Sequence, residues 1–173
     1  MDISTGDMLT RFHFMSSLIL SIQKAASEGF LLPESAENIL SLLSRSSSPV
    51  YPAAVGELAE AGNWVELNNR FFRTLAFGTG GLRGKTIGAV VTQAERGEPQ
   101  ALGRPQFPCV GTNAMNQYNI SRATQGLTLY VKDHFAKQGR SGKPAICLCH
   151  DTRFFSREFA ELAAEIITEL GCD

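Results

Sequence analysis

The sequence predicts an α/β protein, with a helical N-terminal extension followed by an incomplete mixed or parallel sheet domain with covering helices. Apolar residues recur at helical spacing through the first 76 residues, whereas residues 77–111 are rich in glycine and proline and lose this period. Near the end, a short apolar run, a polar loop and an amphipathic helix follow one another, as in the first part of a βαβ unit. We therefore divide the chain into an extension, residues 1–76, and an incomplete domain, residues 77–173.

Composition limits the class of protein. The 173 residues are 43% hydrophobic and 19% charged, which is enough for one domain with a core. A formal net charge of -1 argues against nucleic acid as a partner. The apolar run 12–22 is too short to span a membrane, and its periodicity favours an amphipathic helix over a targeting segment. Four cysteines without secreted-scaffold spacing indicate reduced thiols and a cytoplasmic location.

The N-terminal extension is expected to contain four helices. The first covers about residues 7–27, with Phe12, Met15 and Ile22 on its apolar face. Proline suits a first helical turn, so Pro33 is expected to open the second helix. A short helix is expected over 53–61. A fourth helix is expected to begin at Asn63, which stands in capping-box spacing to Glu66. Its buried stripe is predicted to be Trp64, Leu67, Phe71 and Leu75.

The second region is expected to alternate strand and helix. Thr86–Thr92 is predicted to be a strand, 95–108 a loop and 113–138 a long helix. A second strand is expected over Ala145–Cys149, and Ser156 is expected to cap the final helix. The predicted apolar face of the long helix is Met115, Ile120, Ala123, Leu127, Tyr130, Val131 and Phe135. That of the final helix is Phe159, Leu162, Ala163, Ile166, Ile167 and Leu170.

The final helix needs a sheet to cover. A crossover helix normally returns to a parallel neighbouring strand, and only two residues follow Gly171. We interpret the sequence as a fragment of a longer protein.

The stretch Phe77–Gly84 carries the clearest chemical signal. Four glycines lie within eight residues, together with Thr79 and Arg83. The glycine spacing excludes a dinucleotide fingerprint, and the chain lacks the P-loop lysine pattern in register. Glycines alone fit a tight turn as well as a phosphate site. Because glycine lets backbone N–H groups approach a ligand and arginine suits phosphate oxygens, a phosphate site is favoured.

Three segments in order resemble the α-D-phosphohexomutases, the phosphoglucomutase/phosphomannomutase family. The first is Phe77–Gly84. The second is Gly111–Asn116, continued by Ala123–Leu127, and the third is His150–Arg153, continued by Ser156 and Arg157. The resemblance covers roughly residues 70–171. The helical region before Phe77 is similar to the longer phosphoglucomutase and phosphopentomutase branch.

The resemblance implies a phosphosugar mutase. In that family a phosphoserine gives its phosphoryl group to a sugar monophosphate, and a sugar bisphosphate intermediate returns the other one. Sugar 1- and 6-phosphates, or pentose 1- and 5-phosphates, are interconverted, with Mg²⁺ as cofactor. Four domains surround the cleft of the complete enzymes. The phosphoserine loop and the metal loop of the family are absent from this sequence, so the isolated chain is expected to be inactive and its partners are sugar phosphate and the remaining domains.

The resemblance also assigns residues. Thr79 and Arg83 are the expected catalytic residues, and Gly78, Gly80 and Gly81 are expected to bind phosphate together with Arg83. For Asp151 and Arg153, a buried ion pair that shapes the loop is favoured over contact with substrate, since buried charges are normally paired.

Two alternatives accompany this interpretation. Cys147, Cys149 and His150 invite a metal site, but zinc needs four ligands, so packing of the two cysteines in the core is favoured and no metal ligand is expected in the chain. The whole chain is alternatively a non-catalytic module that binds a sugar phosphate or regulates a partner.

Overall fold

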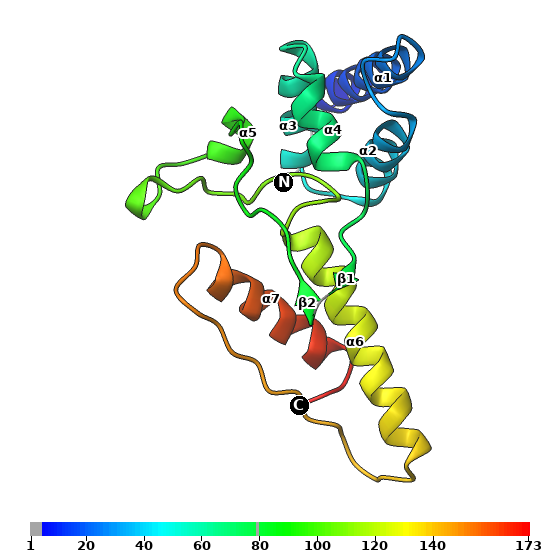
Figure 1. Cartoon of the computed structure of the whole chain (residues 1–173), viewed down its shortest axis with the longest axis vertical. Helices are drawn as coiled ribbons and strands as arrows, with labels where there is room; N and C mark the ends of the chain where they lie inside the picture. Colours follow the sequence, from blue (N-terminus) through cyan, green and yellow to red (C-terminus); the bar gives the residue numbers. More distant parts are fainter. Residues whose placement is uncertain (1–4, 79) are drawn as a thin grey trace. The chain divides into compact units, whose positions relative to one another are not determined.

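A computed structural model describes residues 5–78 and 80–173, which fall into two compact units, Met1–Ala114 and Met115–Asp173 (Figure 1). The described chain is mostly helical with a small two-stranded antiparallel sheet, and the predicted α/β class is confirmed. The division of the sequence at residues 76 and 77 follows motif content and stays a prediction. Within the described residues, no helix is long and apolar enough to cross a membrane.

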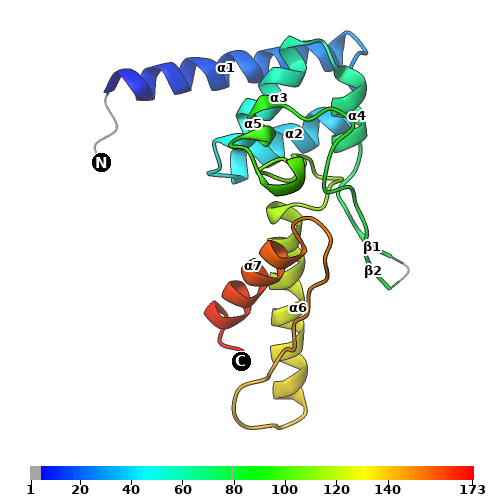
Figure 2. The same ribbon diagram turned by 90° about the vertical axis from the view of Figure 1, so that its left-hand side faces the viewer.

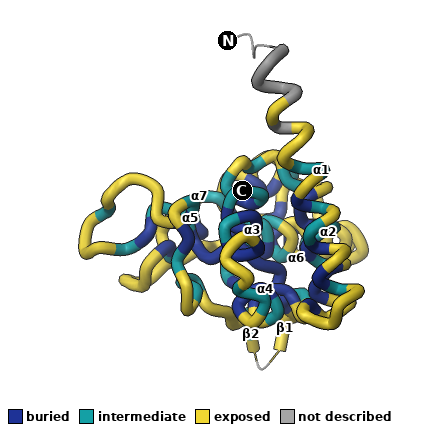
Figure 3. The backbone as a smooth tube through the Cα atoms, turned by 90° about the horizontal axis from the view of Figure 1, so that it is seen from above, coloured by how far each residue is buried: buried dark blue, intermediate teal, exposed yellow. Residues whose placement is uncertain are grey.

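The first unit is built around its four longest helices, which Figure 2 shows lying against one another. They are α1 (Thr5–Ser27), α2 (Pro33–Arg45), α3 (Val50–Glu60) and α4 (Trp64–Phe71), in good agreement with the sequence expectation. Helices α2 and α3 contact each other, and each of them also contacts α1 and α4. The four helices therefore pack together around one core. Buried positions gather where these helices meet (Figure 3). The most deeply buried side chains are Ile22, Leu31, Ile39, Leu42, Val55, Leu67 and Phe71.

The predicted face of α1 is shifted. Leu18, Ile22 and Ala25 are buried, whereas the ring of Phe12 is 70% exposed. The two helices that contact α1 are α2 and α3, and they cover the face that carries these three residues. Residue spacing within a helix identifies its apolar positions, but it does not show which of two adjacent faces a neighbouring helix will cover.

A short hairpin follows α4. Strands β1 (Phe77–Gly78) and β2 (Gly81–Leu82) pair antiparallel, with Phe77 opposite Leu82. Gly80 has a φ of +79°, in the left-handed region that glycine adopts without strain. Directly after the hairpin, Lys85 forms an isolated parallel bridge with Ala114. The chain therefore returns to the hairpin at the end of the first unit.

The predicted strand Thr86–Thr92 is wrong, because bends and irregular backbone occupy this segment. The carbonyl of Val90 accepts a hydrogen bond from the Arg70 side chain, so this backbone group serves a guanidinium and not a neighbouring strand. The segment leads into the short helix α5 (Gln93–Arg96) and the 3-10 turn η1 (Ala101–Gly103), where a loop was predicted.

Two helices make the second unit. Helix α6 (Gln117–Lys137) begins four residues later than predicted, where the Asn116 side chain accepts a hydrogen bond from the N–H of Asn119 at 3.1 Å. Helix α7 (Ser156–Glu169) packs along α6. Its predicted cap is wrong, since Ser156 is the first helical residue and Phe155 precedes it at a φ of 67°. Phe155 is buried and stacks on Phe159, which offsets the cost of this backbone conformation.

The apolar face predicted for α6 is exposed in part. Leu127 is 54% exposed and Tyr130 is 65% exposed, while the buried α6 side chains are Asn119, Thr124 and Thr128. Within the second unit, α7 packs on α6, and the buried row of α6 is therefore polar. The face of α7 is as predicted, with Phe159, Ala163, Ile166 and Ile167 buried.

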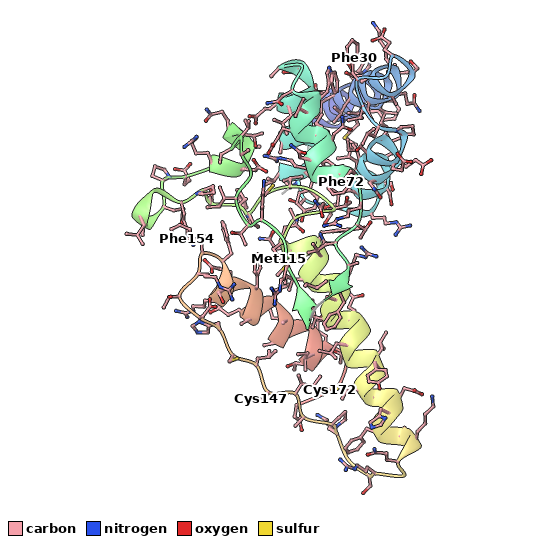
Figure 4. The ribbon with its side chains drawn as sticks, viewed as in Figure 1. Phe30, Phe72, Met115, Cys147, Phe154 and Cys172 are labelled. Atoms are coloured by element: carbon pink, nitrogen blue, oxygen red, sulfur yellow. The ribbon has the colours of Figure 1, made fainter. Side chains whose placement is uncertain are left out.

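The segment Ala145–Cys149 is extended but carries no assigned strand. Ile146 donates its N–H to the Asp173 carbonyl at 2.7 Å, and Asp173 donates its N–H to the Pro144 carbonyl at 3.0 Å. This alternation is the pattern of a parallel ladder. The prediction that Cys147 and Cys149 pack in the core is wrong, because both side chains are exposed. Cys147 lies on this extended segment (Figure 4).

Candidate functional site

The site begins with a salt bridge inside helix α4. The Asn63 side chain accepts the N–H of Glu66 at 3.2 Å, which confirms half of the predicted capping box. The Glu66 carboxylate does not return to the cap; its Oε1 lies 2.8 Å from Nε of Arg70, one turn further along the helix. Both side chains are buried, so this ion pair lies on the face of α4 that points into the first unit.

A second carboxylate completes this network. Glu95 Oε1 lies 2.6 Å from Arg70 Nη1, and Glu95 Oε2 lies 3.3 Å from Nη2. The Val110 carbonyl accepts a hydrogen bond from Arg70 Nη1 at 3.3 Å, and the Val90 carbonyl accepts one from Arg70 Nη2. A guanidinium with all its nitrogens bonded satisfies the requirement that a buried charge be paired and hydrogen-bonded.

Glu95 is itself held in place by a capping box at the start of α5. The Thr92 hydroxyl accepts the N–H of Glu95 at 3.2 Å, and the Thr92 N–H donates to Glu95 Oε2 at 3.0 Å. The N–H of Val110 donates to Glu95 Oε1 at 2.7 Å. On the other side, the Glu57 carboxylate accepts the N–H groups of Gln93 and Ala94 at 2.6 and 2.8 Å. The polar segment 92–109 therefore carries one buried carboxylate to Arg70.

Two glycines allow this close packing. A Cβ on Gly88 would overlap the Arg70 guanidinium and lie 2.9 Å from Glu66 Oε1. A Cβ on Gly111 would lie 2.7 Å from the Arg70 carbonyl oxygen. Neither glycine has a positive φ, so close approach, and not backbone freedom, explains the absence of a side chain at both positions.

The segment 109–114 is hydrogen-bonded to the end of α4. Asn113 donates its N–H to the Arg70 carbonyl at 2.9 Å and its Nδ2 to the Asn69 carbonyl at 3.2 Å. Its Oδ1 accepts Arg73 Nε at 3.0 Å. The Thr112 hydroxyl donates to the Arg73 carbonyl at 2.8 Å. Residues 109–114 are thus fixed against the last turn of α4 by main-chain and side-chain bonds alike.

These segments line a solvent-accessible cavity of about 340 Å³ within the first unit. The end of α4 forms one wall, with Phe72 at its last turn (Figure 4), and segments 83–88 and 109–114 form the others. The lining residues are Glu66, Asn69, Arg70, Phe72, Arg73, Arg83, Gly84, Lys85, Gly88, Cys109, Asn113 and Ala114. The second half of the first motif therefore meets the beginning of the second motif in one cavity.

Burial shapes the ionisation of this site. Burial raises the pKa of the Cys109 thiol to about 12, against the opposing charge of Arg70. For Arg70, burial disfavours the charge, but the neighbouring Cys109 and Glu95 and the hydrogen bonds to Glu95 and Glu66 outweigh it and the pKa is raised. At neutral pH the cavity therefore contains a protonated thiol and a paired guanidinium on its inner side.

The predicted site residues fall in different places. Arg83 lines the cavity, whereas Gly78, Gly80 and Gly81 lie in the hairpin and Thr79 lies outside the described residues. Their roles in binding and catalysis stay predictions.

Asp151 and Arg153 lie in the second unit and form the expected ion pair, with Arg153 Nη2 2.7 Å from Asp151 Oδ2. The pair is exposed and not buried. The hydrogen bonds from the Arg153 side chain and backbone hold the pKa of Asp151 well below its ordinary value. The Ser156 hydroxyl accepts the N–H of Asp151 at 3.1 Å, so the loop is closed onto the start of α7.

Sequence reasoning missed the buried network and most of the cavity lining. The signals were present: Glu66 and Arg70 have i, i+4 spacing, and Thr92 and Glu95 have capping-box spacing. Local patterns do not reveal the contact between Arg70 and Glu95, because these residues are 25 positions apart in the sequence.

Comparison with known proteins agrees with the motifs. Residues 109–173 match the family described as phosphoglucomutase/phosphomannomutase, alpha/beta/alpha domain I. A phosphoglucomutase of Staphylococcus haemolyticus is 31% identical over 101 residues, which are 58% of this chain and 13% of that protein. A phosphoribomutase of Saccharomyces cerevisiae is 31% identical over 110 residues, which are 64% of this chain and again 13% of that protein. The chain thus spans about an eighth of the length of these relatives. No solved structure matches it.

Proposed function

We propose that this chain, whose residues 109–173 belong to domain I of the phosphoglucomutase/phosphomannomutase family, is the N-terminal part of a phosphosugar mutase. The observation that carries the proposal is the cavity in which Arg83 and Gly84 of the first motif lie with Asn113 and Ala114 of the second. Residues of two motifs that lie far apart in the sequence line one cavity, which supports a common role toward one ligand.

The reaction is the transfer of a phosphoryl group from a serine of the longer protein to a sugar monophosphate. The resulting bisphosphate returns its other phosphoryl group to the serine, so that a sugar 1-phosphate becomes a 6-phosphate, or a pentose 1-phosphate a 5-phosphate. In this chain Arg83 binds phosphate oxygens as a charged donor. Thr79, four residues earlier in the sequence, takes the second catalytic role that the motif resemblance implies. The serine is supplied by sequence beyond these 173 residues.

Mg²⁺ belongs to the proposal for the longer protein, together with a sugar bisphosphate as activator. Among the described residues no group of three or more His, Cys, Asp or Glu side chains is placed to hold a metal ion. No step of the proposal is therefore assigned to a metal ligand of this chain. The cysteine usage supports a cytoplasmic location.

The isolated chain is proposed to be inactive, because it contains the phosphate-binding residues without the nucleophile. Two measurements test the proposal. The reading frame after codon 173 is expected to encode a serine–histidine loop, and the longer product is expected to convert glucose 1-phosphate to glucose 6-phosphate or ribose 1-phosphate to ribose 5-phosphate. Arg83→Ala in that product is expected to abolish turnover, with Lys24→Met on α1 as the matched charge-removal control.

The second candidate is a non-catalytic module that binds a sugar phosphate. It is favoured by the fact that all the residues lining the described cavity belong to the first unit. A stop codon after Asp173, together with sugar-phosphate binding and no turnover, would establish it. Turnover by the 173-residue chain that Arg83→Ala abolishes would contradict both candidates as stated here.

A further inference from the structure

The polar segment 92–109 has no part in the proposed chemistry, and yet it contains a fully buried carboxylate. Glu95 is 1% exposed, and the helix α5 that carries it is four residues long. Glutamate is almost never buried to this extent unless it is paired, and well-packed apolar residues often stabilise a fold as well as a buried ion pair does. A gain in stability is therefore not a sufficient reason for burying Glu95, whereas its contacts indicate a role in positioning.

One oxygen of Glu95 joins the beginning of the second motif to helix α4. Glu95 Oε1 accepts the N–H of Val110 at 2.7 Å and lies 2.6 Å from Nη1 of Arg70. Arg70 Nη1 also donates to the carbonyl of Val110 at 3.3 Å. The backbone of Val110, one residue before the second motif, is therefore held on its donor side and on its acceptor side by the same ion pair.

The same guanidinium holds the chain that leaves the first motif. Arg70 Nη2 donates to the carbonyl of Val90, and Glu66 Oε1 accepts the N–H of Val90 at 3.5 Å. Gly88 packs so closely on Arg70 that a Cβ at this position would overlap Nη2. Arg70 therefore bonds to the backbone on both sides, after the first motif and before the second.

The two segments that Arg70 holds also contact each other directly. Lys85 forms a parallel bridge with Ala114. Cys109 donates its N–H to the Thr86 carbonyl at 2.9 Å. Arg83 of the first motif lies two positions before this bridge. Its backbone is therefore placed relative to the second motif by bonds that lead back to the buried ion pair.

From these contacts we propose that Glu95 and Arg70 are positioning residues for the mutase reaction, and that segment 92–109 serves to supply Glu95. The pair holds segment 83–90 against segment 109–114, which are the stretches of backbone that carry residues of the two motifs. The inference deepens and rests on the proposed function. Segment 92–109, which lies between the motifs, thereby has a role in the reaction.

The action of the pair is indirect. The N–H donors of Arg70 are directed to Glu66, to Glu95 and to two backbone carbonyls, so its guanidinium is occupied within the protein. What the pair controls is the place of Arg83, and a displacement of reacting groups by about 1 Å costs roughly a hundredfold in rate. A contact that does not touch substrate is therefore able to govern turnover.

The test is steady-state kinetics of the longer product for Glu95→Gln and Arg70→Lys, with glucose 1-phosphate or ribose 1-phosphate as substrate, whichever the wild type converts. Glutamine keeps the shape of Glu95 without its charge, and lysine keeps the charge of Arg70 without its planar fork. Each variant is expected to lower kcat by about tenfold to a hundredfold and to change KM by less than about threefold, because a misplaced donor is missed mainly in the transition state.

A milder variant gives the same readout if these two do not fold. Thr92→Val removes the hydroxyl that lies 2.9 Å from Glu95 Oε2, but it leaves the ion pair with Arg70 in place. The carboxylate is then held less firmly, and kcat is expected to fall by roughly threefold to tenfold.

Two controls separate positioning from stability. Ile22→Ala removes a buried side chain of α1, whose helix contacts within the described structure are with α2 and α3. It is expected to lower stability without changing kcat or KM. Glu28→Gln removes an exposed carboxylate 3.8 Å from Lys24 and is expected to change neither stability nor rate. Circular dichroism verifies that each variant is folded at the assay temperature.

A double-mutant cycle with Arg83→Lys supplies a readout that a purely structural role would not move. If Glu95 acts through Arg83, the loss of kcat/KM in the double variant is expected to be smaller than the product of the two single losses, by roughly threefold or more. Two independent effects would instead multiply.

Two results would overturn the inference and leave the proposed function intact. One is an unchanged kcat in the folded Glu95→Gln and Arg70→Lys variants. The other is a double-mutant cycle in which the two losses multiply. A wild-type longer product without turnover is a different result, because it refutes the proposed function and the inference together, so the two failures are distinguishable.

Discussion

Arg70 Nη1 lies 2.6 Å from Glu95 Oε1, and both side chains are almost wholly buried. The contact joins the end of α4 to α5, across a segment that the sequence shows only as a polar loop. A buried ion pair is not in itself evidence of net stabilisation, because desolvation opposes the attraction. Removal of one partner is a different matter, since it leaves an uncompensated charge in the interior.

Arg70→Met is therefore expected to destabilise the first unit by about 3–5 kcal/mol, because Glu66 and Glu95 are left buried without their cation. The measurement is urea unfolding followed by the fluorescence of Trp64, which lies on the same helix as Arg70. Lys24→Met, which removes an exposed lysine 3.8 Å from Glu28, is the control and is expected to have little effect. Equal unfolding midpoints for the two variants would contradict the role given to the network.

Gly88→Ala is expected to destabilise the same unit by roughly 1–3 kcal/mol, since a methyl group there overlaps the Arg70 guanidinium and the Glu66 carboxylate. Gly81→Ala is the matched control, because a Cβ at that position meets no atom within 4 Å and the φ is not positive. Both variants are compared by the same unfolding assay. If Gly88→Ala were as stable as Gly81→Ala, the packing of segment 83–88 against α4 would be wrong.

The four thiols are expected to differ in reactivity. Cys147 and Cys149 are exposed and are expected to react with iodoacetamide at pH 8, whereas Cys109 and Cys172 are buried and are expected to react only after unfolding in urea. Peptide mass spectrometry reads out each site. Modification of Cys109 as fast as Cys147 in the folded chain is the contrary outcome.

Cys109 also gives a pH dependence. Its folded pKa of about 12 lies above the ordinary value of 9.0, because burial disfavours the thiolate. The contribution of the thiol to stability is therefore complete below pH 9 and is lost as the pH rises from about 9 toward 12. Cys109→Ala is expected to flatten this alkaline loss of stability in the Trp64 unfolding assay, and Cys147→Ala, at an exposed position, is expected to leave it unchanged.

In the second unit, the Asp151 carboxylate is expected to stay ionised to a lower pH than an ordinary aspartate, because Arg153 donates side-chain and backbone hydrogen bonds to it. Since the folded pKa is depressed, the contribution of the pair is present above the unfolded pKa and is lost as the pH falls through the folded one. Carboxyl-carbon NMR measures the titration directly. Arg153→Met is expected to shift it upward, and Arg157→Met, which pairs with Glu161 instead, is expected not to.

Local patterns predicted the helices well and their partners poorly. The bounds of α1, α2 and α4 and the buried stripe of α7 follow from spacing, capping and proline placement, which act within one helix. The predicted strand Thr86–Thr92 is wrong because a backbone carbonyl of this segment accepts a hydrogen bond from Arg70 of α4. The shifted face of α1 has the same origin, since neighbours decide which row is buried.

The candidate site shows the same division. Arg83 was found from glycine spacing and motif resemblance, and it lines the cavity. Arg73, Lys85 and Asn113 reach that cavity only because segments 83–88 and 109–114 meet at the end of α4. A single sequence lists these residues but does not show which distant segments come into contact in the fold.

The exposed apolar face of α6 leads to a prediction that separates the two candidate functions. In the 173-residue chain, Leu127→Ala is expected to cost less than about 1 kcal/mol, because its side chain is already half in water. Ile167→Ala on the buried face of α7 is the matched comparison and is expected to cost about 2–5 kcal/mol through loss of packing. Hydrogen exchange of peptides from α6 and α7 measures both effects within the second unit.

The same substitutions in a longer product give the discriminating result. The two hydrogen bonds between residues 144–146 and Asp173 have the pattern of a parallel ladder. Parallel sheets are normally covered by helices on both faces. If the chain is the beginning of a mutase, added sequence is expected to bury Leu127 and raise the cost of Leu127→Ala toward that of Ile167→Ala. A longer product in which Leu127→Ala stays nearly neutral would argue that α6 keeps its face exposed, as the binding-module alternative requires.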